Sequence, residues 1–323
     1  MKRRTFCAGA LAAALPLTGS AAAALPEGTL KLLVGFPPGG GTDIVGRAIA
    51  EQAGAALDRS VLVVNQPGAS GLIAAKGLTR SKADGATVGL SGSTTAVIAP
   101  LANKNVDIDF VNDVDPIISL CTYSLTISVA NGTGVRNMAD LITWAKSKPA
   151  GTLYGHGGTG SIAHLFGEML GREFGLSLQH VPFKGGNDLV AAVLGGHIEL
   201  AINNTSEVAD LHRTGKLRSI AVTSRRRSKA LPSVPTLDEL GHKNLECEPW
   251  SALWAPKGTP AEAVTEWNRA CNAGLKSAKM QETLARLGFE ATGGTVAQMR
   301  ETVVADYARW KRIIDSLGFS VTA

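Results

Sequence analysis

Cysteine is scarce in this sequence, and no apolar run beyond residue 25 is long enough to span a bilayer. Three cysteines follow that residue, Cys121, Cys247 and Cys271, and no two have the spacing of a redox or metal-binding pair. We therefore expect buried, reduced cysteines, with a single disulfide as the alternative in an oxidising compartment. These absences exclude a membrane-spanning body and a disulfide scaffold.

The common motifs of catalysis and cofactor binding are missing as well. Gly89-Leu90-Ser91-Gly92-Ser93 is no nucleophile elbow, because a glycine directly follows Ser91. The histidines and carboxylates show no HExxH motif and no other metal-ligand spacing. We expect no cofactor, no metal and no enzyme. A hydrolase whose triad assembles across the sequence remains the minor alternative.

Residues 1–25 have the pattern of a secretory signal peptide. Lys2, Arg3 and Arg4 form a basic start, an apolar stretch covers residues 8–17, and small residues at 21–23 suit a cleavage site. The sequence thus predicts export to the periplasm, by the general or the twin-arginine route. Removal of the peptide lowers the formal net charge from +5 to about +2, so nucleic acid is not an expected partner.

A glycine-rich turn lies at the centre of the chain's organisation. The apolar run 30–36 predicts a buried strand, Gly39 to Gly41 a tight turn, and the residues after Thr42 an amphipathic helix capped by that threonine. A dinucleotide fingerprint would need glycine at Ile44, and a P-loop would need a lysine. Such a turn can present backbone N–H groups to an anion, or it can be purely structural.

Two kinds of element occur twice. Residues 179–194 repeat the plan of strand, proline, paired glycines and helix, and residues 89–101 resemble residues 154–166. This duplication predicts an α/β fold of two Rossmann-like lobes with a binding cleft between them. The β-branched run 116–129 is long for one strand and is interpreted as a crossing between lobes. The expected limits are 26–122 with 224–323 for one lobe and 123–223 for the other.

Several stretches together resemble the tripartite tricarboxylate transporter substrate-binding receptors, or Bug receptors. They cover almost the whole mature chain in the family's order: VGFPPGGGTDIVGRAIA, NQPGASGLIAAKGL, YGHGGTGSIAHLFGE, HVPFKGG, GGHIELAINN, GKLRSIAVTSRRRSKALPSVPTLDELG and LWAPKGTPAEAV. The resemblance implies a type II periplasmic binding protein that closes on a small carboxylate. It also implies a monomer whose protein partner is a set of membrane permease subunits or a sensor kinase.

Carried over by motif, the resemblance implies a contact set rich in neutral donors and without arginine. Its members are Phe36, Gly40, Gly41, Thr42, Asp43, Ser91, Gly92, Ser93, Thr94, His156, Gly157, Gly158, Thr159, Gly160, Ser161, Lys184, Gly185, Gly186 and Asn203.

Two positions depart from the family's usual pattern. His156 stands where serine is common, in a glycine loop with little else to pack on, so it is expected to contact ligand. Asn203 stands where aspartate is common, which removes a partner for an ammonium group or relieves repulsion of an anion. Asp43 can instead stabilise its helix N-terminus, and Lys184 can be merely solvated. His164 would lie on the first turn of the helix after the loop, where we expect it to make a structural hydrogen bond. Dicarboxylates, amino acids and aromatic acids all remain open as ligands.

Overall fold

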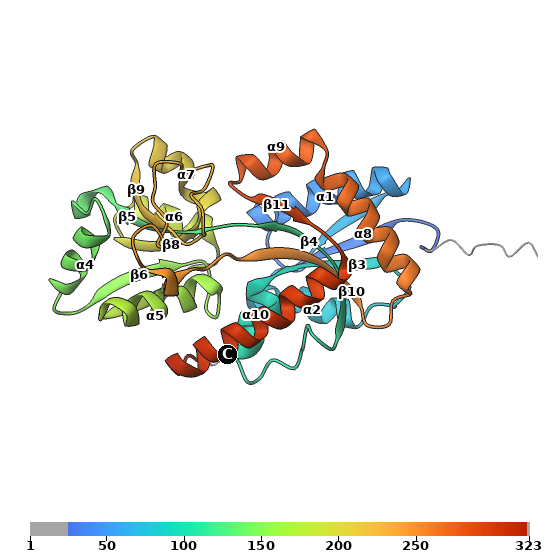
Figure 1. The fold of residues 1–323 in the computed structure, drawn as a ribbon, viewed down its shortest axis with the longest axis horizontal. Helices are drawn as coiled ribbons and strands as arrows, with labels where there is room; N and C mark the ends of the chain where they lie inside the picture. The colour runs from blue at the N-terminus through green and yellow to red at the C-terminus, as the bar shows by residue number, and fades with distance from the viewer. Residues whose placement is uncertain (1–24, 322–323) are drawn as a thin grey trace, which may run out of the picture.

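The computed structural model describes residues 25–321 and contains two β-sheets, each covered by helices (Figure 1). The predicted signal peptide lies outside these residues, apart from Leu25, which is packed in the core at 3% exposure. We call the six-stranded sheet with its helices lobe 1 and the five-stranded sheet with its helices lobe 2. This two-lobe α/β architecture confirms the predicted fold class. The residue limits of the lobes remain a prediction.

The sheet of lobe 1 is mixed, with strand order β11-β4-β10-β3-β1-β2. Strand β1 pairs in parallel with β2 and β3, whereas β10 and β11 run antiparallel to their neighbours. Three of the β1 positions are buried in succession, as expected for a strand covered on both faces. The strands are β1 (Leu30–Val34), β2 (Val61–Asn65), β3 (Thr87–Gly92), β4 (Val114–Thr122), β10 (Trp250–Pro256) and β11 (Glu290–Gly293).

The sheet of lobe 2 has strand order β7-β6-β8-β5-β9. Strands β7, β6 and β8 are parallel, so their carboxyl ends meet at one edge, and β5 runs antiparallel to both of its neighbours. The strands are β5 (Leu125–Ala130), β6 (Thr152–His156), β7 (Leu178–Pro182), β8 (Leu200–Asn204) and β9 (Leu217–Val222).

The crossing predicted for residues 116–129 is confirmed, but as two strands. Strand β4 belongs to lobe 1 and β5 to lobe 2, with Tyr123 and Ser124 between them. Ser124 Oγ accepts the N–H of Thr223 at 3.1 Å, and Tyr123 N–H donates to Pro249 O at 2.9 Å. The segment that leads from lobe 1 to lobe 2 is therefore hydrogen-bonded to the segment that leads back. Figure 1 shows both segments passing between the lobes in the middle of the picture.

Helices cover both faces of each sheet. One buried cluster joins α1, α8 and α9 to lobe 1, and a second runs from α2, α3 and α10 into lobe 2. The long helix α10 extends from lobe 1 toward lobe 2 (Figure 1). The helices are α1 (Gly41–Leu57), α2 (Leu72–Thr79), α3 (Ala99–Ala102), α4 (Met138–Lys146), α5 (Ile162–Phe174), α6 (Gly186–Leu194), α7 (Thr205–Arg213), α8 (Ala261–Leu275), α9 (Ala278–Arg286) and α10 (Val296–Leu317).

The predicted cap of the first helix is wrong. Helix α1 begins two residues earlier than predicted, at Gly41, and its N-cap is Gly40, which provides no side-chain hydrogen bond. Thr42 therefore lies inside the first turn. Because no side chain caps this end, its first backbone N–H groups are not occupied by a cap. The prediction of buried cysteines is confirmed, since Cys121, Cys247 and Cys271 are all buried and free. Among the described helices, none has the length and apolarity needed to cross a membrane.

Gly167 lets α5 pack directly on the ring of Tyr154. A Cβ atom at this position would lie 2.1 Å from the ring. We expect Gly167→Ala to destabilise the fold by about 1–3 kcal/mol through overpacking, although alanine is the better helix former. Urea unfolding measures this change. If the clash is the cause, Tyr154→Leu should lower the free energy of unfolding less in the Gly167→Ala background than in the wild type. Additive losses of this free energy would contradict a clash.

Candidate functional site

The two lobes meet along a line of polar contacts that we call the interlobe seam. It is formed by Gly41, Ser70 and Thr94 of lobe 1 and by Gly158, Thr159, Ile162 and Ser206 of lobe 2. Ser70 Oγ donates to Thr159 O at 3.1 Å, and Thr94 Oγ1 accepts the N–H of Ile162 at 3.2 Å. The seam thus brings together three of the predicted segments, the first glycine turn, the end of β3 and the loop after β6.

Asp43 holds the glycine turn at the start of α1. Its carboxylate accepts from Gly39 N at 2.9 Å, Arg47 Nε at 2.9 Å and Asn65 Nδ2 at 2.8 Å. Burial alone would raise the pKa of this carboxyl, but the hydrogen bonds from Arg47, Gly39 and Asn65 outweigh burial and lower it. The side chain is 2% exposed. The geometry therefore favours the structural alternative for Asp43.

The N-terminus of α1 carries backbone donors toward lobe 2. The first backbone hydrogen bond of the helix is Ile44 N to Gly40 O, so the N–H groups of residues 41–43 precede the helical ladder. A Cβ atom at Gly41 would lie 3.4 Å from the ring of Phe289 and 3.9 Å from Ser206 Oγ at the start of α7. The amino-terminal ends of α1 and α7 thus face each other across the seam, an arrangement that favours an anion between them.

The predicted loop at residues 91–94 divides into two parts. Ser93 is 1% exposed and exchanges hydrogen bonds with the backbone of Trp250, so it joins β3 to β10. The carbonyl of Ser91 accepts from Trp254 Nε1 at 3.2 Å, and a Cβ at Gly92 would lie 2.5 Å from Trp250 O. These residues hold the strand end in place, and among the described hydrogen bonds of these four residues only that of Thr94 crosses the seam.

The loop after β6 rests on buried histidines. His156 Nδ1 accepts the N–H of Gly158 at 3.3 Å, and His164 Nδ1 accepts that of Gly160 at 3.2 Å. The two imidazole rings stack in parallel, 4.5 Å apart. The expectation that His156 has little to pack on is wrong, because its side chain is fully buried beneath the loop. The predicted structural hydrogen bond of His164 is confirmed, and Ser161 caps α5 through the N–H of His164.

The fold forms a histidine cluster that the sequence does not indicate. The sequence shows no metal-ligand spacing, yet the fold brings His156, His164 and His180 together, with one ring nitrogen of each within 4.8 Å of the others. His180 comes after α5 in the sequence and lies on β7, the strand that pairs with β6. Sequence spacing carries no sign of this cluster, because it depends on the parallel pairing of β6 with β7.

Burial keeps the rings of His156 and His164 neutral. Desolvation, with the nearby His180, lowers the pKa of His156 to about 4, and desolvation, with His156 and His180, lowers that of His164 to about 3. The folded chain therefore binds fewer protons than the unfolded chain between those values and the ordinary pKa of about 6.5. Stability is present in full above about pH 6.5 and falls as the pH drops.

We expect His156→Ser to flatten this acid dependence. Between pH 7 and pH 5 the wild type should lose roughly 2 kcal/mol through His156 alone, by the proton linkage of a pKa lowered to about 4. Denaturant unfolding with a chelator present, at each pH, measures the difference between variants. His197→Ser removes an exposed histidine and is the matched control. Equal acid dependence in all three proteins would contradict the neutral, buried state of His156.

Asn203 is the next-to-last residue of β8, at the same edge of the lobe 2 sheet. It is 2% exposed, and neither polar atom of its amide has a well-formed hydrogen bond among the described residues. The amide lies near Glu207. Burial raises the pKa of the Glu207 carboxyl, and hydrogen bonding from Asn204 and Asn203 reverses this rise only in part. A buried amide without a well-formed hydrogen bond is costly, so these polar atoms keep the capacity to pair with a further group.

The second glycine turn contributes less than the sequence suggests. Lys184 is exposed. A Cβ at Gly185 would meet nothing within 4 Å, whereas one at Gly186 would overlap the Glu207 carboxylate at 1.9 Å. The start of α6 therefore already has a carboxylate of this chain beside it. A Cβ at Gly157 would lie 3.6 Å from Gly186 N, so the loop after β6 passes directly over this turn.

Sequence reasoning missed the residues at 65–71. Ala69 and Ser70 have positive φ angles of 47° and 54°, a strained backbone for residues other than glycine. Ser70 is held there because its carbonyl accepts from Thr95 Oγ1 at 2.7 Å while its hydroxyl reaches Thr159 across the seam. The Pro-Gly-Ala-Ser-Gly pattern marked a turn, but no local signal showed that this turn touches the other lobe.

Comparisons with known proteins agree with this architecture. Residues 45–319 match the family described as tripartite tricarboxylate transporter family receptor. Protein BugT of Bordetella pertussis is 30% identical over 294 residues, which is 91% of this chain and 90% of BugT. The solved structure of the periplasmic binding protein BugD superposes with a TM-score of 0.84 at 29% identity, covering 91% of this chain and 99% of BugD.

A further solved relative holds a ligand. The R. palustris protein Rpa4515, solved with adipate, has a TM-score of 0.85 and 31% identity, with coverage of 91% of this chain and 99% of that protein. The family match spans most of the sequence, and the fold agrees with those of its solved members. This chain belongs to the tripartite tricarboxylate transporter receptor family, which is a family of periplasmic solute-binding receptors and not of enzymes.

Proposed function

We propose that this protein captures a small organic carboxylate between its lobes in the periplasm and delivers it to membrane permease subunits. The N-terminal signal peptide would direct its export. The adipate held by Rpa4515 supports a carboxylate as the ligand class. A sensor kinase could receive the closed form instead of a permease, because the same seam serves either partner. Binding occurs without turnover in this proposal.

The observation that carries the proposal is the buried amide of Asn203, which has no well-formed hydrogen bond among the described residues and lies on the strand that leads into α7, opposite Gly41. An amide N–H can donate to a carboxylate oxygen, and the free N–H groups at the start of α1 can donate to the same anion. Partial charges and neutral donors would then replace a charged clamp, and they favour selection by the shape and size of the ligand.

The proposed contacts comprise backbone and hydroxyl donors from both lobes. Asp43, Ser93 and His156 would act by holding these donors in position, since each is already engaged within its own lobe. The direct contacts would come from Phe36, Gly40, Gly41, Thr42, Thr94, Gly157, Gly158, Thr159, Gly160, Ser161 and Asn203.

A thermal-shift screen tests the ligand class. Mature protein would be melted with dicarboxylates, aromatic acids, amino acids and neutral sugars, each in excess. A ligand at a hundred times its dissociation constant adds roughly 2.7 kcal/mol, which raises the melting temperature by several degrees. We expect shifts from carboxylates, with the compound recovered intact by mass spectrometry. Shifts from sugars alone would contradict the proposed ligand class, and recovery of a converted compound would contradict binding without turnover.

A further inference from the structure

Three histidines from three different elements of lobe 2 converge beside a cavity. His156 ends β6, His164 lies in the first turn of α5, and His180 lies on β7. His156 Nε2 and His180 Nδ1 are 3.2 Å apart. Two nitrogens bound to one tetrahedral Zn²⁺ at 2.0–2.1 Å are separated by about 3.3 Å, so this pair already has the spacing of two metal ligands.

We propose that His156, His164 and His180 bind one borderline transition-metal ion, of which Zn²⁺ is the representative. Imidazole nitrogen is a common ligand of such ions, and three histidines with one open position form a known type of zinc site. Nothing in the proposed carboxylate function requires this ion, so the site stands apart from that function.

The third ligand has to move before it can bind. His164 now stacks on both partners, with ring centroids 4.5 Å from His156 and 4.1 Å from His180. A metal ion lies in the plane of the imidazole that binds it, so the His164 ring must turn out of its stack. Its nitrogen starts within 4.8 Å of the other two, which leaves a short distance to close.

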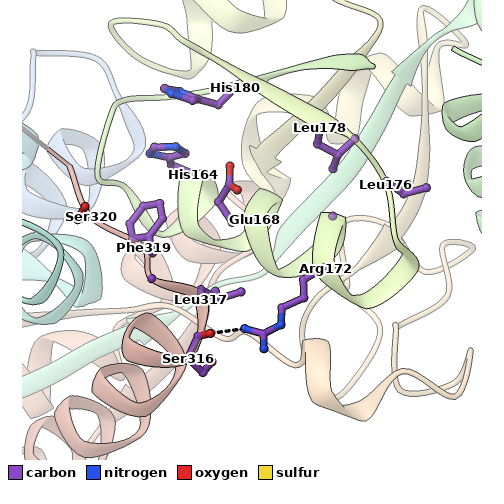
Figure 2. A pocket seen from close by; sticks show the side chains of 12 residues that line it. His164, Glu168, Arg172, Leu176, Leu178, His180, Ser316, Leu317, Phe319 and Ser320 are labelled. Carbon is purple, nitrogen blue, oxygen red and sulfur yellow. Dashed lines mark hydrogen bonds between the residues drawn. The ribbon is translucent and has the colours of Figure 1, made fainter. Parts of the chain in front are cut away.

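The surroundings favour neutral ligands, which is the state that a metal ion needs. Burial lowers the pKa values of His156 and His164, so protons compete little for these rings near neutral pH. Glu168, which accepts from Tyr154 Oη at 3.0 Å, and Tyr154 itself are titratable groups beside them, and Arg172 lines the same cavity. Figure 2 shows Glu168 projecting from α5 beside His164, where its carboxylate can neutralise part of the charge of the ion.

A cavity supplies the remaining coordination position. Its volume is about 680 Å³, and its lining includes His164, Glu168 and His180 together with residues 316–320, at the end of α10 and just after it. Phe319 packs edge-on against His164, with 4.9 Å between centroids (Figure 2). The cavity has room for water, so one or more water molecules can complete a coordination shell around the ion.

Metal binding also changes the loop above the histidines. While Nδ1 of His156 and of His164 accepts a backbone N–H, each neutral ring carries its proton on Nε2. Binding through Nε2 moves that proton to Nδ1, which then faces the N–H of Gly158 or Gly160. The loss of such a neutral hydrogen bond costs far less than a structural zinc ion contributes. The loop should therefore shift when the ion binds.

Metal retention tests the site without any carboxylate. Tag-free mature protein would be dialysed against Zn²⁺, and the bound metal counted per chain and titrated by calorimetry. We expect about one ion per chain in the wild type and in His197→Ser, which removes an exposed histidine outside the cluster. His156→Ser and His180→Gln should each weaken binding by at least about tenfold, since each removes a ligand.

Cobalt substitution adds a readout that a change of stability would not imitate. Co²⁺ in the wild type should give the intense visible bands of a tetrahedral site, and His156→Ser should lose them. Circular dichroism would check that each variant is folded, and His180→Gln changes an exposed side chain. Absence of bound metal in the folded wild type, or equal affinity in wild type and His156→Ser, would overturn the proposal. Carboxylate binding could survive either result.

Discussion

Gly41→Val is expected to abolish carboxylate binding while leaving the fold intact. A Cβ at this position would lie 3.4 Å from Phe289 and 3.9 Å from Ser206, so the larger side chain would enter the seam between the two helix N-termini. It would hold the lobes apart and cover the free N–H groups at the start of α1. Blocked approach to several donors should lower affinity by at least about a hundredfold, or roughly 2.7 kcal/mol.

The fold should tolerate this change because Gly41 is the first residue of α1 and has no positive φ angle. Ala261→Val is the matched control, since it places the same side chain at the exposed first residue of α8. Isothermal titration with the carboxylate found in the screen measures the affinity, and small-angle scattering measures compaction on binding. Wild-type affinity in Gly41→Val would show that ligand binds elsewhere.

Asn203→Asp is expected to lower carboxylate affinity by about a hundredfold. The side chain is 2% exposed, so a carboxylate there would meet the ligand's charge in a poorly solvated place, near the buried Glu207. An amino acid should suffer less, because its ammonium group gains a partner. Titration with a dicarboxylate and with its amino analogue separates the two effects.

Asn203→Leu is the companion variant. The amide of Asn203 has no well-formed hydrogen bond among residues 25–321, so an apolar side chain of similar size should change the melting temperature of the free protein little. Carboxylate affinity should still fall by about tenfold or more, because a donor is lost. If both variants bind the carboxylate as the wild type does, Asn203 does not contact the ligand. Its buried amide would then not support the proposed function.

The limits of prediction are clearest at particular residues. The β-branched run 116–129 predicted a crossing, but the break at Tyr123 and Ser124 depends on hydrogen bonds to Pro249 and Thr223, far away in sequence. Thr42 was predicted to cap α1, and the backbone placed the cap at Gly40. Helix boundaries depend on dihedral angles that a residue type only favours, so an error of two residues there is expected.

The histidines show the same limit in the candidate site. His164 was predicted to make a structural hydrogen bond because a first-turn position restricts what a side chain can reach, and it makes that bond. His156 was expected to face ligand because its neighbours in sequence are glycines. Its neighbours in space are His164 and His180, brought there by a helix and a parallel strand.

The sequence by itself determined the two-lobe α/β architecture, the glycine turns and the neutral character of the candidate site, because periodicity, turn residues and the absence of local motifs are properties of short segments. Only the tertiary structure decided which polar groups are engaged and which are free. Asp43 and Ser93 make hydrogen bonds within lobe 1, and Ser70 makes one to the other lobe. The amide of Asn203 has no well-formed hydrogen bond among the residues that the structure describes. Hydrogen-bond partners distant in sequence settle such roles, since pairing depends on position in space.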